Sequence, residues 1–190
     1  SEEETKTCVK LVTDNGGKVS SNFAEVGDNK FVFTISDKPR RTMKSLFALA
    51  SGLMPLTVSW LKECVKLGKY PQISPKEHLH RVPGTSDDFV KSVVSRNGTD
   101  RLPRKDRILA NHLFRISEDL SAWVEIISEA GGVLCVSQQM KRGKRTSTKV
   151  AICSDLTEEE EIRELTKFSK PVALDWLFES LTAQITLDPD

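Results

Sequence analysis

Residues 15–19 read Asn-Gly-Gly-Lys-Val, and residues 130–134 read Ala-Gly-Gly-Val-Leu. In both places an amphipathic stretch ends in two glycines, and a β-type run follows. A tryptophan opens an apolar helical pattern 44 residues after the first glycine of one pair and 45 residues after that of the other, at Trp60 and Trp176. Two signals at nearly equal spacing, offset by about 115 residues, indicate two copies of one structural unit.

The two copies are expected to share one order of elements. In the first copy, helices are expected over residues 3–15, 39–49 and 60–68, with strands over 30–35 and 54–58. In the second, strands are expected over residues 108–116, 133–136, 150–153 and 172–174, and helices over 120–130, 158–168 and from 176 onward. Strands that alternate with helices predict an α/β fold, with a small parallel four-stranded sheet flanked by helices in each copy.

The chain divides into two repeats and a connection. Residues 1–70 form the first repeat, 107–190 the second, and 71–106 a linker punctuated by prolines and glycines. Within the linker, residues 85–95 are expected to form one or two amphipathic helical turns. The first copy starts directly at its helix, so we expect its opening strand either to lie upstream of Ser1 or to be supplied by another segment.

Composition narrows the class of protein. The 190 residues are 38% hydrophobic and 29% charged, which is typical of a globular chain and not of a disordered tail, a collagen-like repeat or a membrane protein. The 28 basic residues nearly balance the 27 acidic ones, which argues against a dedicated nucleic-acid module. The four cysteines are far apart and form no C-x-x-C pair. They predict buried free thiols in a reducing compartment, with a disulfide or a reactive thiol as the alternative.

The doubled unit, with two glycines after the first helix and a tryptophan in the last, resembles the tandem BRCT repeat. The resemblance covers nearly the whole chain. It is strengthened by residues 41–52, Arg-Thr-Met-Lys-Ser-Leu-Phe-Ala-Leu-Ala-Ser-Gly, preceded by Ile-Ser-Asp at 35–37. This stretch is similar to the second helix of the phosphopeptide-binding BRCT pairs found in DNA-damage checkpoint mediators.

The resemblance implies a scaffold module that recognises the phosphorylated C-terminal tail of a core histone of the 2A class, in the nucleus, on chromatin at DNA breaks. Lys44 matches the family's phosphate-binding lysine, and Arg41 matches the arginine that reaches the ligand's backbone or free carboxylate. The family's third phosphate contact is a Ser or Thr at the end of the first strand. Ser1 falls at about that position, where a helix cap explains it equally well. A groove between the repeats would be lined by Leu46, Ile126 and Phe178, for which plain core packing is the alternative.

The residues alone also favour an anion site at Arg41 and Lys44. Positions i and i+3 share one face of a helix, so both cations would point the same way. An ammonium suits a phosphate oxygen, and a guanidinium fork suits a carboxylate. The alternative is a solvated basic face, because four cations fall within residues 38–44.

No catalytic arrangement emerges from the sequence. His78 and His80 have no third ligand at suitable spacing, so no metal and no cofactor is expected, and we expect the chain not to be an enzyme. The expected partners are a phosphorylated histone tail or another phosphoserine protein, together with checkpoint proteins, and not a membrane. Three alternatives stay open: a phosphate-independent interaction or homodimerisation module, a DNA-end binder acting through residues 141–149, and a catalytic flavodoxin-like domain.

Overall fold

The computed structural model describes residues 2–20, 25, 31–98, 100–135 and 147–188. The chain forms two compact units, one of residues 1–48 and 53–101 and the other of residues 49–52 and 102–190. The second unit therefore includes the short segment 49–52. Residues 71–101, assigned to a linker above, cluster with the first unit because their apolar side chains are buried, including Ile73, Val82 and Val93.

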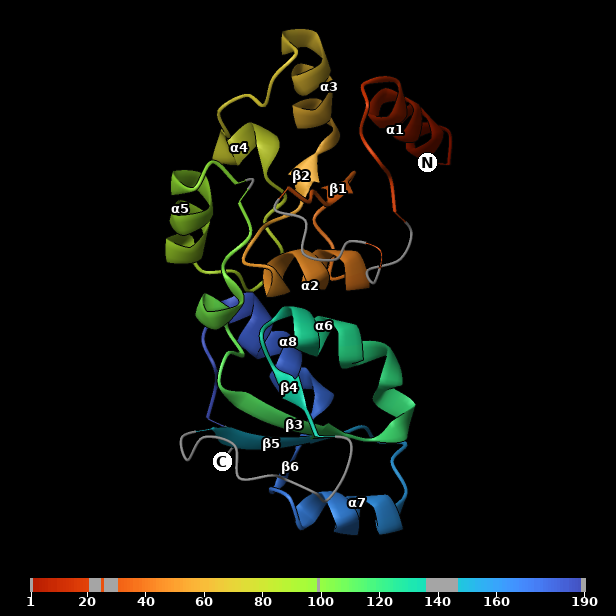
Figure 1. Cartoon of the computed structure of the whole chain (residues 1–190), viewed down its shortest axis with the longest axis vertical. Helices are drawn as coiled ribbons and strands as arrows, with labels where there is room; N and C mark the ends of the chain where they lie inside the picture. Colours follow the sequence, from red (N-terminus) through yellow and green to blue (C-terminus); the bar gives the residue numbers. More distant parts are fainter. Residues whose placement is uncertain (1, 21–24, 26–30, 99, 136–146, 189–190) are drawn as a thin grey trace. The chain divides into compact units, whose positions relative to one another are not determined.

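The second unit is an α/β sandwich around a four-stranded parallel sheet of order β4-β3-β5-β6. Helices α6 and α8 lie on one face of the sheet and α7 lies on the other (Figure 1). Both faces of β5 are covered, since Val150, Ala151 and Ile152 are all fully buried. The elements are η2 (Arg104–Asp106), β3 (His112–Ile116), η3 (Glu118–Trp123), α6 (Val124–Glu129), β4 (Val133–Leu134), β5 (Thr148–Cys153), α7 (Glu159–Thr166), β6 (Pro171–Ala173) and α8 (Leu174–Ala183).

The first unit repeats the second half of this pattern. Its strands β1 and β2 pair in parallel, with Ile35 opposite Leu56, as β5 pairs with β6 in the second unit. The described residues of this unit give a two-stranded sheet, where four strands were expected. The elements are α1 (Glu2–Asp14), β1 (Ile35–Ser36), α2 (Met43–Ala50), β2 (Leu56–Thr57), α3 (Val58–Leu67), α4 (Pro75–His78) and α5 (Asp87–Ser95).

The tryptophans occupy matching places in the two units. Trp60 is the third residue of α3 and Trp176 the third residue of α8, so each helix begins two residues before the position expected from the sequence. The reason in α3 is Thr57, whose hydroxyl caps the helix by accepting the backbone N–H of Trp60 at 3.2 Å. Trp60 is 1% exposed and stacks on Tyr70, and Trp176 packs against Phe114, so each helps to form the core of its unit.

The glycine pairs form the same helix-ending turn in both units. The first glycine donates its N–H three residues back and the second donates five residues back, as Gly16 to Thr13 and Gly17 to Val12, with the same pattern at 131 and 132. Gly16 and Gly131 both have left-handed φ angles, of 79° and 92°. This geometry is the Schellman motif, which favours glycine, and it confirms the expected turn that needs no Cβ.

The two left-handed glycines differ in what surrounds them. A Cβ on Gly16 would meet nothing within 4 Å, whereas one on Gly131 would lie 2.8 Å from the carbonyl oxygen of Arg104. We therefore expect Gly16→Ala to lower the free energy of unfolding by about 1 kcal/mol, the cost of the left-handed backbone, and Gly131→Ala by more than about 2 kcal/mol. Urea unfolding of both variants measures the difference. Equal losses would contradict the role of the Arg104 carbonyl.

The four cysteines are free, and each is half-buried, which corrects the expectation of fully buried thiols. Burial raises the pKa of the Cys64 thiol to about 11, and burial also raises the pKa values of Cys8 and Cys153. A raised pKa keeps a thiol protonated and slow to react at neutral pH. Among the described residues, no helix is both long and apolar enough to cross a membrane.

Candidate functional site

The N-terminus of α2 is built by Thr42. Its hydroxyl accepts the backbone N–H of Ser45 at 3.2 Å, and its carbonyl accepts that of Leu46 at 2.9 Å. The first N–H groups of a helix have no partner within the helix. The backbone N–H groups of Met43 and Lys44 have none among the described residues either. Two unused amides and the positive end of an eight-residue helix therefore lie together at this terminus.

Lys44 is the second residue of α2, and its side chain is exposed. Its ammonium makes no ion pair or hydrogen bond with any residue that the structure describes. The apolar side chains that follow it, from Leu46 to Ala50, are buried, so the helix is anchored in the core while Lys44 stays in solvent. An unpaired ammonium at a helix N-terminus is suited to an anion.

Arg41 lies outside the helix, which corrects the expected shared helical face. The helix begins at Met43 and not near residue 39, because Thr42 caps it. Arg41 instead reaches across unit 1 to the carbonyl oxygen of Pro83, to which it donates from Nη2 at 3.2 Å and from Nε at 3.4 Å. Arg41 is exposed and makes no ion pair within the described part of the chain. The two cations thus lie on either side of the cap residue. Lys44 belongs to α2, whereas the side chain of Arg41 is held by the carbonyl of Pro83.

Two of the three residues expected to line a groove are buried, and the third is half-buried. Leu46 belongs to unit 1 and is 1% exposed, while Ile126 belongs to unit 2 and is fully buried. Phe178, also in unit 2, is half-buried and packs edge-on against Trp123 at 4.8 Å. The groove requires residues of both units, and it stays a prediction.

The matching place in the second repeat has the opposite charge. Helix α7 is the counterpart of α2, and its first turn carries Glu159, Glu160 and Glu161. Next to it, the carboxylate of Asp119 accepts hydrogen bonds from the hydroxyls of Ser154 and Thr157.

The carboxylate of Asp119 is also favoured in its charged form. The pKa of Asp119 is lowered because the nearby hydroxyls of Ser117, Ser154 and Thr157 favour the carboxylate. A phosphate would be repelled there, and the hydroxyls that could bind it already serve Asp119. Of the two matching helices, α2 is the one suited to an anion.

His78 and His80, which the sequence analysis did not expect to bind a metal, contact different partners. His78 contacts the carboxylate of Glu63 through Nε2 at 3.0 Å and accepts the backbone N–H of Ser74 at Nδ1. His80 instead contacts the carbonyl oxygen of Ser36 at 2.9 Å. Across the residues that the structure describes, no group of three His, Cys, Asp or Glu side chains could hold a metal ion. The basic run at residues 141–145 lies outside the described residues.

Two features of the site were missed by the sequence analysis. The capping role of Thr42 could have been found from its position just before an apolar helical run. The contact of Arg41 with Pro83 spans 42 residues of sequence, and no local pattern indicates it.

Comparison with known proteins identifies the fold. No protein-family model matches the sequence, and no curated protein matches it either. Among solved structures, the chain is similar to the BRCT5-BRCT6 domains of S. pombe Brc1, with a TM-score of 0.53 and 16% identity over 94% of this chain and 86% of that one. It is also similar to Rtt107p solved in complex with a phosphorylated histone of the 2A class, with a TM-score of 0.49 and 14% identity over 97% and 83% of the two chains. The expected fold is confirmed: this chain has the fold of tandem BRCT repeats.

Proposed function

We propose that this chain is a phosphopeptide-binding module and that the N-terminus of α2 receives the phosphate. The observation that carries the proposal is that the exposed Lys44 and the backbone amides of Met43 and Lys44 belong to one helix end, and neither the ammonium nor the amides have a partner among the described residues. A phosphate brings nearly two negative charges and three acceptor oxygens, which match one ammonium and two N–H donors. Arg41 would bind the ligand's backbone or its free C-terminal carboxylate through a guanidinium fork.

The strength of such a site is modest. Each charge-assisted hydrogen bond contributes about 1.5–3 kcal/mol. Two or three of them, offset by the cost of ordering an extended peptide, fit micromolar affinity, or about −8 kcal/mol. This is the range of a scaffold that binds and releases modified tails, and the proposal does not include catalysis.

The ligand that we propose is the phosphorylated C-terminal tail of a core histone, bound in the nucleus at sites of DNA damage. This part of the proposal comes from the resemblance of residues 41–52 to the phosphopeptide-binding helix of checkpoint mediators. Other phosphoserine proteins, including checkpoint proteins, present the same chemistry.

Isothermal titration tests the proposal with three forms of one histone-tail peptide: phosphorylated with a free C-terminus, unphosphorylated, and phosphorylated with an amidated C-terminus. We expect micromolar binding of the first, no measurable binding of the second, and about 10-fold weaker binding of the third. Equal binding of the first two peptides would overturn the proposal in favour of a phosphate-independent interaction module. Binding of duplex DNA that falls steeply with salt, without peptide binding, would favour the DNA-end alternative.

A further inference from the structure

A tight turn in unit 1 provides the carbonyl that Arg41 contacts. Residues 82–85 read Val-Pro-Gly-Thr, and the backbone N–H of Thr85 donates to the carbonyl of Val82 at 3.1 Å. Gly84 has a φ of 94°, and the ring of Pro83 keeps its own φ negative. A negative φ followed by a left-handed glycine defines a type II turn. Since types I and II differ by a flip of the central peptide, Gly84 decides where the Pro83 carbonyl points.

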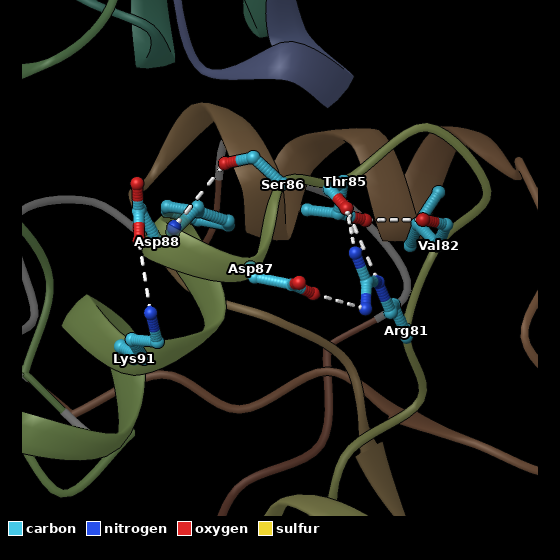
Figure 2. A network of polar contacts seen from close by, with 8 residues as sticks. Arg81, Val82, Thr85, Ser86, Asp87, Asp88 and Lys91 are labelled. Atoms are coloured by element: carbon cyan, nitrogen blue, oxygen red, sulfur yellow. Dashed lines mark hydrogen bonds and ion pairs between the residues drawn. The ribbon is translucent and has the colours of Figure 1, made fainter.

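Arg81 holds this turn closed. Its Nε and Nη2 groups both donate to the carbonyl of Thr85, and Nη1 pairs with the carboxylate of Asp87 at 2.6 Å (Figure 2). The hydroxyl of Thr85 donates to the carbonyl of Val82, so the two ends of the turn are joined twice. Val82 and Thr85 are buried, while Pro83 and Gly84 between them are exposed. The turn is thus anchored at its ends and presents its tip to solvent.

The tip of the turn accepts hydrogen bonds from one edge of the Arg41 guanidinium. The Pro83 carbonyl accepts from Nε and Nη2 of Arg41, and within the part of the chain that the structure describes, the Nη1 group and one hydrogen of Nη2 have no partner. The unused pair is the end of the guanidinium that can grip a carboxylate with two parallel hydrogen bonds. An exposed arginine that is already held on one edge loses less rotamer freedom when a ligand binds.

We propose that Arg81 is a positioning residue for ligand binding. It holds the turn at residues 82–85 so that the Pro83 carbonyl orients Arg41 toward the ligand's C-terminal carboxylate. The proposal rests on the proposed function of Arg41. It goes further in assigning a role to Arg81 and Gly84, neither of which touches the ligand. It also gives a role to the hydrogen bond between Arg41 and the carbonyl of Pro83, which lies 42 residues later in the sequence.

The test is a double-mutant cycle. Arg81→Gln and Arg41→Gln are made singly and together, and each protein is titrated with the phosphopeptide in free-acid and amidated forms. We expect Arg81→Gln to weaken free-acid binding about 3- to 10-fold and to leave amidated binding unchanged. In the Arg41→Gln background, Arg81→Gln should have no further effect.

The controls come from the same segment. Asp88→Asn removes an exposed ion pair with Lys91, 3.1 Å long, on the same helix α5 (Figure 2), and it should change neither titration. Asp87→Asn removes one partner of Arg81 and serves as the milder variant if Arg81→Gln lowers the melting temperature strongly. Gly84→Ala disfavours the type II turn and should reproduce the effect of Arg81→Gln.

Two results of the titrations would overturn the proposal, and a third result, from NMR, would do the same. One is that Arg81→Gln weakens binding of the free-acid and the amidated peptide equally. The other is that Arg81→Gln weakens free-acid binding as much in the Arg41→Gln background as it does in the wild type. The Nε–H proton of Arg41, followed by NMR, gives a readout without ligand: its exchange with water should be slow in the wild type and faster in Arg81→Gln. If the wild type binds no phosphopeptide, the proposed function fails as a whole. Unchanged exchange in Arg81→Gln contradicts the positioning role itself.

Discussion

Lys44→Met is expected to remove measurable binding of a phosphorylated tail peptide while leaving the melting temperature nearly unchanged. Lys44 is exposed and its ammonium makes no ion pair or hydrogen bond with a described residue, so the folded protein loses almost nothing when its charge is removed. The bound phosphate, in contrast, loses a charge-assisted hydrogen bond. That loss corresponds to about 1.5–3 kcal/mol, or about 10- to 150-fold in affinity, so little complex forms at micromolar peptide concentrations.

The matched control is Lys38→Met, six residues earlier in the same basic run. Lys38 is exposed, but it precedes α2 and is not part of the anion site proposed at the N-terminus of that helix. If the run acts only as a solvated basic face, the two variants will weaken binding by the same small factor, and raising the salt concentration will abolish the difference from wild type. Identical titration curves for wild type and Lys44→Met would remove Lys44 from the site.

Glu129→Ala is expected to lower the free energy of unfolding of the second unit by about 3–5 kcal/mol. The Glu129 carboxylate pairs with Nη1 of Arg107 at 2.9 Å, and the side chain of each is only 11% exposed. It also accepts the hydroxyl of Ser51 at 2.6 Å. Removing the carboxylate takes this ion pair from the largely buried Arg107 guanidinium, whose hydrogen bonds to the carbonyls of Leu102 and Glu129 remain.

Urea unfolding followed by tryptophan fluorescence measures this loss. Glu159→Ala is the matched control, because Glu159 pairs with Arg163 at 3.6 Å on the exposed face of α7, and both side chains are more than three-quarters exposed. Exposed pairs contribute less than about 1 kcal/mol. Comparable losses in the two variants would contradict the importance of burial. Replacing Glu129 and Arg107 together by apolar residues should restore part of the stability lost in Glu129→Ala.

The repeat explains why so much of the fold was predictable. A glycine pair that ends a helix and a tryptophan that begins one are local signals, and each depends on backbone geometry or on side-chain periodicity within a few residues. Their duplication turned two weak signals into a strong one, and the confirmed tandem fold follows from it. Element boundaries were less accurate. Pro39 suggested a helix start, but the hydroxyl of Thr42 places it at Met43.

The candidate site was predictable in its residues and not in its geometry. Lys44 and Arg41 were found because their residue types and spacing suit an anion, and their role stays a prediction that the titrations above test. Their shared helical face was wrong, because a sequence pattern assumes a continuous helix and contains no information on where a cap interrupts it. The contact of Arg41 with Pro83, and the turn held by Arg81, depend on segments 42 residues apart.

The sequence by itself determined the two-repeat organisation, the parallel α/β class and the identity of the exposed cations, because these follow from periodicity, glycine conformation and charge along neighbouring residues. Only the tertiary structure showed that, within the described residues, neither the Lys44 ammonium nor the first amides of α2 have a partner. It also showed that Asp119, beside the acidic start of α7, accepts hydrogen bonds from Ser154 and Thr157, and that Arg41 donates to the carbonyl of Pro83. Hydrogen bonds between distant segments form only when the whole unit packs. The entropic cost of closing the loops between those segments is offset by the burial of apolar side chains from many parts of the chain, which no local stretch of sequence reveals.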